Sequence, residues 1–422
     1  MAPVDLFQHC KTVGIIAEYN PFHNGHAYQI REVRKQSGAD YIIIVMSGDF
    51  VQRGRPALLD KYARARLALL GGADLVLELP CAAASGSAAR FAQEAVRILD
   101  RLGVVQELWF GSEAGELAPL LEAAAVLAEE PPHFRNALRQ SLRQGNSYPL
   151  ARQKALEACS ADGEKLAAPE LLCLPNNILG IEYCTALKRL RSSVLPRTLK
   201  RVGSGYHDRQ ASGSFASASA LRLAVKTGNP EEAERQMPPE VFSAFSRLLS
   251  REGWLELNDF SLLLKCLLLD SREEDLLPCM PRETARRVLS LRNHFLSFSQ
   301  FAELIKTRGR TRSSIDRDLL HFLLGIPSAS GLSPGSAFSG SLACRTITDD
   351  GFARVLGFRR RSSPLLASIK QAEGLRLEAR PSRLPREAYA LDLRASNLYE
   401  AVRSQKMGQS FREECTRQPV IL

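Results

Sequence analysis

Residues 12–33 read TVGIIAEYNPFHNGHAYQIREV. The apolar run at the start of this stretch is continuous rather than alternating, which predicts a strand buried on both faces. Pro21 ends the run, Asn24 and Gly25 permit a tight turn, and a helix is predicted to begin near His26. The stretch therefore predicts a strand, a short loop and a helix in immediate succession.

The same succession repeats through the first half of the chain. Apolar runs predict strands at residues 12–19, 41–48, 73–80 and 105–112. Amphipathic segments between them predict helices at residues 26–38, 58–72 and 87–103. This alternation is typical of an α/β fold with a Rossmann-like, doubly wound parallel sheet. Ligands of such sheets bind outside the carboxyl ends of the strands, which is where the loop before His26 lies.

The length of the chain and a change in its predicted secondary structure indicate two domains. Its 422 residues exceed the roughly 250–300 residues at which single hydrophobic cores stop growing. The first domain is expected to span 11–228, and it ends with a strand and loop at 200–208 and a helix at 217–228. The remainder, 229–422, reads mainly as helices, so a mainly helical C-terminal domain is predicted, with one strand at 352–358.

Composition narrows the class of partner and the compartment. A formal net charge of +10 and a pI near 9.3 favour a polyanionic partner, although a solvated basic surface gives the same numbers. The nine cysteines form no Cys-x-x-Cys pair, and neither a secretory signal nor an apolar run long enough for a membrane span is visible. We expect a cytoplasmic protein with reduced thiols and no membrane contact.

The loop after the first strand is the candidate site. A helix N-terminus offers free N–H groups and partial positive charge, which favour phosphate. His23 and His26 can donate hydrogen bonds to phosphoryl oxygens there, and Gly25 lets a ligand approach the backbone closely. Two other readings stay open: a zinc pair, for which no third ligand is evident, and histidines that serve only the structure.

The loop also resembles a known motif. HNGH matches the His-x-Gly-His signature of the HIGH superfamily, which contains nucleotidyltransferases and class I aminoacyl-tRNA synthetases. The longer string GIIAEYNPFHNGHAY is similar to the tRNA(Met) cytidine acetate ligase family. Further motifs carry that resemblance: VMSGDFVQRGRPALLDKYARARLAL (45–69), DLVLELP (74–80), FGSE (110–113), PNNILGIEY (175–183), YHD (206–208) and, more weakly, residues 311–326 and 391–400.

The resemblance implies a specific reaction. Members of the family use ATP, which normally travels with Mg²⁺, to convert acetate into acetyl-adenylate with release of pyrophosphate. They transfer the acetyl group to N4 of the wobble cytidine, C34, of elongator tRNA(Met). By the same resemblance, His23 and His26 are the catalytic residues and contact the triphosphate, and no residue is assigned to a metal. The implied ATP-binding residues are Ile16, Glu18, Asn20, His23, Gly25, His26, Gly111, Asn176, Asn177 and Arg201.

Taken without the resemblance, several of these residues have structural alternatives. Gly111 ends a predicted strand and can be a turn glycine, and Arg201 can be a solvated charge. Asn176 and Asn177 can cap the helix that follows Pro175, and the sequence leaves open which of the two binds.

Arginines and lysines cluster in the second half. Such clusters suit the phosphates of a folded RNA, or they form an exposed basic surface. The clusters are Lys306, Arg308, Arg310, Arg312 and Arg317; Arg359, Arg360 and Arg361; and Arg376, Arg380, Arg383 and Arg386.

Two functions compete with an RNA-modifying ligase. One is an adenylyltransferase for a phosphorylated small molecule. Such an enzyme does not need a large basic second half. The other is a non-catalytic RNA-binding protein with a vestigial nucleotide fold, against which the retained histidines argue.

Overall fold

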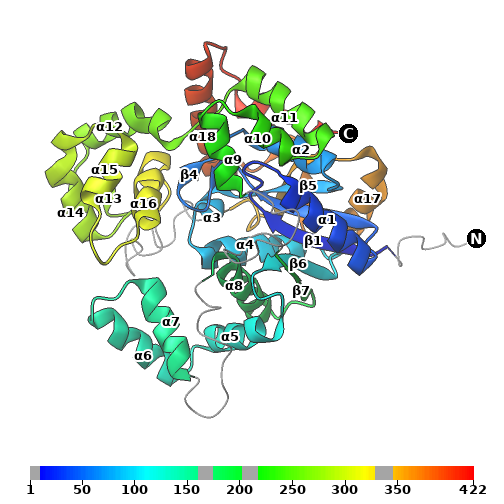
Figure 1. The fold of residues 1–422 in the computed structure, drawn as a ribbon, viewed down its shortest axis with the longest axis horizontal. Helices are drawn as coiled ribbons and strands as arrows, with labels where there is room; N and C mark the ends of the chain where they lie inside the picture. Colours follow the sequence, from blue (N-terminus) through cyan, green and yellow to red (C-terminus); the bar gives the residue numbers. More distant parts are fainter. Residues whose placement is uncertain (1–9, 160–173, 202–216, 328–345) are drawn as a thin grey trace, which may run out of the picture.

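A single twisted sheet forms the centre of the protein (Figure 1). The computed structural model describes residues 10–159, 174–201, 217–327 and 346–422. The strand order is β10-β8-β5-β2-β1-β6-β7, with β9 paired to β8 beside this path. The strands of the first half are β1 (Thr12–Ala17), β2 (Tyr41–Ser47), β5 (Leu75–Leu79), β6 (Glu107–Ser112) and β7 (Leu195–Lys200). The four apolar runs are therefore confirmed as strands, and the predicted late strand lies a few residues earlier than expected.

The order of the strands places the site. From β1 the chain passes to β2 and β5 on one side, and then crosses to β6 and β7 on the other, with these strands all parallel. The direction of winding thus reverses between β1 and β6. In open α/β sheets ligands bind at such a switch point, outside the carboxyl ends of the strands.

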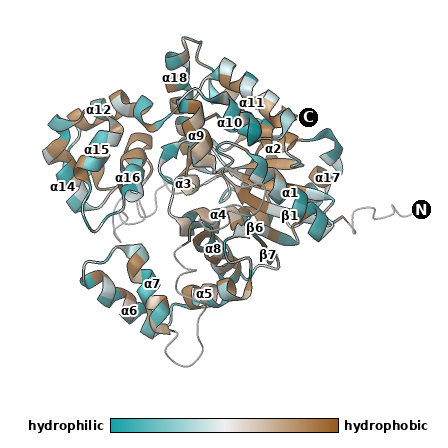
Figure 2. Cartoon of the chain, viewed as in Figure 1, coloured by the Kyte–Doolittle hydropathy of each residue, from teal (hydrophilic) through white to brown (hydrophobic). Residues whose placement is uncertain are grey.

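Both faces of the sheet are covered, as the continuous apolar runs predict. Ile42, Ile44 and Met46 of β2 face one core, and Ile43 and Val45 face the other. The strands are hydrophobic in Figure 2, whereas the surrounding helices mix hydrophobic and hydrophilic residues. The first core packs against α1 (Asn24–Ser37), α2 (Lys61–Leu70) and α11 (Pro239–Glu252), and the second against α4 (Ala88–Arg101), α5 (Ala118–Glu129) and α8 (Pro175–Leu190).

The second half also contributes strands to this sheet, which the sequence predicted from the first half of the chain alone. The predicted strand at 352–358 is confirmed as β8 (Phe352–Phe358), and it pairs antiparallel with β5. β10 (Val420–Ile421) continues the sheet beyond β8, and β9 (Arg376–Glu378) pairs with β8 as well. An uncovered β5 would leave unpaired backbone groups along an edge, which β8 satisfies. The division at residues 228 and 229 stays a prediction.

The rest of the second half is helical, as expected. One cluster of helices forms a third core, in which Phe50 from the first half also lies. Besides α11, the α-helices that follow β7 in the described residues are α9 (Ala218–Lys226), which confirms the helix predicted at 217–228, α10 (Pro230–Arg235), α12 (Ser261–Asp270), α13 (Glu273–Leu276), α14 (Arg282–Leu291), α15 (Phe298–Ile305), α16 (Arg312–Leu324), α17 (Ser363–Gln371) and α18 (Arg386–Met407).

Smaller elements complete the fold. A short helix follows β5, a helical pair lies at the lower left of Figure 1, and a two-stranded hairpin follows β2. These elements are α3 (Cys81–Ala84), α6 (Pro132–Arg143), α7 (Tyr148–Cys159), β3 (Phe50–Val51) and β4 (Arg55–Pro56). Within the described ranges, no helix is both long and apolar enough to cross a membrane. The YHD motif at 206–208 lies outside the described residues.

A buried charge network ties the C-terminal segment to the sheet. Lys61 on α2 has no exposed surface, and its Nζ lies 2.7 Å from Glu78 Oε1 and 2.9 Å from Glu414 Oε1. Nζ also donates to the hydroxyl of Ser396 on α18 at 2.8 Å. Burial disfavours the charged amine, but the carboxylates of Glu414 and Glu78 outweigh burial and raise the pKa of Lys61 well above its usual value.

Removing one acid from this network should destabilise the whole protein. We expect Glu414→Ala to lower the free energy of unfolding by about 3 kcal/mol or more, because it leaves Lys61 with one fewer counter-charge in the interior. Urea denaturation followed by circular dichroism measures this change. Glu413→Ala is the matched control, since Glu413 is exposed, and it should stay within about 0.5 kcal/mol. Equal effects of the two substitutions would contradict the assignment.

Candidate active site between β1 and β6

Two histidines cap the N-terminus of α1. His23 is the N-cap residue in extended conformation, and its Nδ1 accepts a hydrogen bond from the Gly25 amide at 3.0 Å. His26 Nδ1 accepts from the His23 amide at 3.3 Å, so the two residues cap the helix reciprocally. Their rings stack with centroids 3.8 Å apart. The helix begins at Asn24, two residues before the predicted start.

These hydrogen bonds determine where the histidine protons lie. Burial and, to a smaller extent, the nearby charge of Arg201 lower the pKa of His23 to about 4. Burial, His23 and Arg201 place the pKa of His26 well below its usual value. Both rings are therefore neutral at pH 7. Since each Nδ1 accepts a hydrogen bond, the single ring proton is on Nε2, which leaves two uncharged donors at the start of α1.

Asn20 holds the loop that carries these histidines. Its side-chain oxygen accepts from the Leu58 amide at 2.8 Å, and its backbone oxygen accepts from Arg222 at 2.7 Å. Arg222 lies on α9. The side chain of Asn20 is thus used within the protein, and the residue shapes the loop.

Ile16 and Glu18 precede the loop and serve different purposes. Ile16 is buried in the core and pairs with Val45 of β2. The carboxylate of Glu18 accepts from the Gln52 amide at 3.0 Å. Burial raises the pKa of Glu18, although this hydrogen bond and nearby arginines oppose the shift. The side chain of Ile16 therefore points into the core, and that of Glu18 contacts the hairpin.

Gly111 and Arg201 form the opposite wall of the site. Gly111 is the last residue but one of β6, and an added Cβ would lie 3.2 Å from Cγ of Arg201. The backbone of Arg201 donates to the Ser112 carbonyl at 3.0 Å, and its guanidinium donates to Asn176 Oδ1 at 3.3 Å. The charge of Arg201 acts on both histidines, so the two walls lie close together.

The two asparagines of PNNILG differ in what their side chains contact. Asn177 is fully buried, and its Oδ1 accepts from the amides of Glu113 at 2.9 Å and Ala114 at 3.1 Å. Asn176 is half-buried and contacts Arg201 and the Glu113 carboxylate, the latter at 2.6 Å. The geometry thus separates a buried residue that supports the loop after β6 from a neighbour that faces Arg201.

Two residues that support the site were not found from the sequence. The Glu113 carboxylate accepts from the Asn177 amide at 2.9 Å and so caps α8. Arg64 is fully buried and donates to backbone carbonyls at the ends of β1 and β2, namely those of Glu18 at 2.7 Å, Ser47 at 3.0 Å and Gly48. In the sequence, Arg64 is one of several arginines in a predicted helix. The only signal that distinguishes it is its position within the motif at 45–69.

The first basic cluster of the second half is partly engaged within the protein. Arg310 pairs with Asp318 at 2.7 Å, and Arg312 pairs with Asp316 at 2.7 Å. Arg317 donates to a backbone carbonyl. Arg310 and Arg312 thus stabilise α16, whereas Lys306 and Arg308 remain exposed.

The other two basic clusters are mostly exposed. Arg359 donates to the Leu69 carbonyl, and Arg361 pairs with Asp74 at 2.9 Å. The exposed members are Arg360, Arg361, Arg376, Arg380, Arg383 and Arg386. Binding of RNA by these residues stays a prediction.

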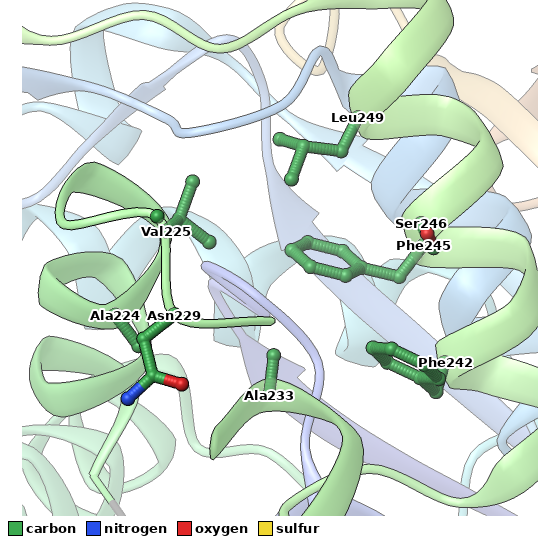
Figure 3. A pocket seen from close by; sticks show the side chains of 9 residues that line it. Ala224, Val225, Asn229, Ala233, Phe242, Phe245, Ser246 and Leu249 are labelled. Atoms are coloured by element: carbon green, nitrogen blue, oxygen red, sulfur yellow. The ribbon is translucent and has the colours of Figure 1, made fainter. Parts of the chain in front are cut away.

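The described residues contain no group of three or more His, Cys, Asp or Glu arranged to hold a metal ion. A separate cavity of about 290 Å³ lies between α9, α10 and α11 (Figure 3). Its walls are mainly apolar, with Val225, Phe242, Phe245 and Leu249 among the lining side chains. The cavity lacks the charged groups that characterise the site between β1 and β6.

The fold and this site define a class of protein. A nucleotide-type sheet with a His-x-Gly-His cap at its switch point is the arrangement of the HIGH nucleotidyl transferases, and the model of the HIGH Nucleotidyl Transferase family matches residues 10–414.

Relatives identify the family within that class. The tRNA(Met) cytidine acetate ligase of Acetivibrio thermocellus is 37% identical over 87% of this chain and 87% of its own length. That of Clostridium kluyveri is 34% identical over 98% of this chain and 99% of its own length. The crystal structure of Thermotoga maritima TmcAL bound with alpha-thio ATP superposes with a TM-score of 0.87 at 28% identity, covering 98% of this chain and 99% of that one. The chain belongs to the tRNA(Met) cytidine acetate ligase family.

The different surroundings of the two asparagines can be tested by stability. We expect Asn177→Ala to lower the free energy of unfolding by about 1–3 kcal/mol, because the amides of Glu113 and Ala114 lose their acceptor. Asn176→Ala should change it by less, since Asn176 is half-buried at the edge of the site. Chemical denaturation of both variants measures the difference, and a larger effect at Asn176 would contradict it.

Proposed function

We propose that this protein activates acetate with ATP and transfers the acetyl group to N4 of the wobble cytidine, C34, of elongator tRNA(Met). The names of its relatives and the bound ATP analogue of the Thermotoga protein support this proposal. The observation that carries it is the pair of neutral histidines capping α1 at the switch point of the sheet. Because its tRNA substrate is there, we place the protein in the cytoplasm.

In the first step, a carboxylate oxygen of acetate attacks the α-phosphorus of ATP, and the bond to pyrophosphate breaks. Negative charge on the transferring phosphoryl group and the leaving pyrophosphate is stabilised by the Nε2 protons of His23 and His26. The partial positive charge at the N-terminus of α1 acts in the same direction. Since these donors are uncharged and fixed by the cap, they need little reorganisation during the reaction.

In the second step, the N4 amine of cytidine attacks the acetyl carbonyl carbon of acetyl-adenylate. The bond from this carbon to the phosphate oxygen breaks, AMP leaves, and the amine loses a proton. Positioning of the two reactants supplies much of the acceleration in a transfer of this kind.

The opposite wall holds the nucleotide in this proposal. Arg201 provides a permanent charge for a phosphate, Asn176 orients Arg201, and Gly111 leaves room beside β6. Mg²⁺ enters with ATP. The carboxylates of Glu18 and Glu113 already accept hydrogen bonds from the protein, so we expect phosphate oxygens and water to hold the ion.

The direct test is nucleoside mass spectrometry of tRNA incubated with the protein, ATP and isotopically labelled acetate. We expect labelled N4-acetylcytidine in elongator tRNA(Met), and a loss of roughly 10²–10³ in rate for His23→Ala, the scale of one lost transition-state donor. A phosphorylated small molecule that accepts AMP, with no label in tRNA, would instead support the adenylyltransferase. Binding of tRNA without pyrophosphate release would support the non-catalytic alternative.

The pH dependence tests the neutral histidines separately. With pKa values near 4 for His23 and lower than usual for His26, neither residue titrates close to 6.5 in the free enzyme. We expect kcat/KM for ATP to show no limb near pH 6.5 that arises from these residues, because kcat/KM reports groups of the free enzyme. The profile is measured by pyrophosphate release between pH 5 and 8. A limb near pH 6.5 in the wild type that is absent from His23→Asn would contradict the assignment.

A further inference from the structure

The hairpin formed by β3 and β4 is attached directly to the proposed active site. It follows β2, and its turn residue Gln52 donates its backbone amide to the Glu18 carboxylate at 3.0 Å. Glu18 lies two residues before Asn20, which holds the histidine loop. The hairpin therefore cannot shift far without moving the end of β1.

The hairpin is also fixed to the helical second half. Phe50 at its base is fully buried and packs against Phe260 and Tyr399, with ring centroids 5.6 Å and 6.0 Å away. At its tip Gly54 has φ +68°, and an added Cβ would lie 2.5 Å from the backbone nitrogen of Arg317 on α16. The turn thus bridges the nucleotide site and α16.

Two arginines project from this rigid turn with little compensating charge. Arg53 is exposed and has no hydrogen-bond or ion-pair partner among the residues that the structure describes. Arg55 is exposed too, and its one carboxylate contact among the described residues is long, 3.4 Å to Asp316. That carboxylate is shared with Arg312 at 2.7 Å. The hairpin therefore carries more positive charge than its surroundings neutralise.

The same two charges reach the active-site loop. Burial lowers the pKa of Arg222, and repulsion from Arg55 and Arg53 lowers it further, while the Glu18 carboxylate opposes the shift. Arg222 itself donates to the Asn20 carbonyl. Arg222, Arg53 and Arg55 come from two elements, and the Glu18 and Asp316 carboxylates near them carry less charge than the three arginines together. This excess of positive charge favours binding of an anion.

We propose that Arg53 and Arg55 bind backbone phosphates of the RNA that flank the reactive cytidine, and so bring its base to the site between β1 and β6. This inference rests on the proposed function. RNA fits better than the triphosphate of ATP, because the hairpin leads from the site to α16, whose preceding loop exposes Lys306 and Arg308. Contacts to phosphate position a nucleic acid rather than specify its sequence.

The test compares Arg53→Ala and Arg55→Ala with the wild type in three measurements: filter binding of elongator tRNA(Met) against salt, KM for tRNA in acetyl transfer, and KM for ATP in acetate-dependent pyrophosphate release without tRNA. Each substitution should weaken tRNA binding about tenfold and reduce the slope of log affinity against log salt by about one. The KM for ATP should change by a much smaller factor than the KM for tRNA.

Two further variants control for charge and folding. Arg53→Lys keeps the positive charge and should recover most of the tRNA affinity. Arg66→Ala removes an exposed arginine that belongs to α2 rather than to the hairpin, and it should behave as the wild type. Thermal melts of all variants confirm that the hairpin substitutions leave the protein folded.

Each result decides between the alternatives. Wild-type tRNA affinity and salt slope in both alanine variants would overturn the inference. A larger rise in the KM for ATP than for tRNA would overturn it as well, and would assign the arginines to the triphosphate. If the wild type itself neither acetylates nor binds the tRNA, the proposed function fails instead, so the two failures are distinguishable.

Discussion

The reciprocal cap between His23 and His26 is the interaction on which the site depends. The Nδ1 atom of each imidazole accepts a hydrogen bond from a backbone N–H at the start of α1, so each neutral ring carries its proton on Nε2. Burial keeps the rings uncharged, and the start of the helix adds a partial positive charge. The same hydrogen bonds that begin the helix therefore create the phosphate-binding group.

This cap stays in place because buried polar contacts fix the loops around it. Arg64 gathers carbonyls from the ends of β1 and β2, where parallel strands leave backbone acceptors without partners. Asn177 and Glu113 fix the loop after β6 in a similar way. The side chain of each residue accepts a hydrogen bond from the backbone N–H of the other, which joins the loop to the start of α8. In each case the side chain lies beneath the site and determines where the exposed groups stand.

Much of the central sheet and the position of the site could be predicted from local patterns. Continuous apolar runs predicted β1, β2, β5 and β6, and Pro21 with the turn after it predicted the loop at the carboxyl edge. The place of β8 could not be predicted in this way, because its seven residues carry no information on which strand they will pair with. The basic cluster near α16 was also only partly informative, since sequence spacing does not show that Arg310 and Arg312 have acidic partners in space.

The sequence by itself determined the sheet-forming runs, the turn before α1 and the histidines within it, because these depend on residues close together in the chain. Only the tertiary structure decided that Asn176 rather than Asn177 faces Arg201, that Glu113 caps α8, and that the charges of the hairpin arginines act on Arg222. The physical reason is that burial and hydrogen bonding depend on neighbours from distant segments. Adjacent residues of a helix lie on different faces, so of two neighbouring asparagines one is buried and the other faces the site.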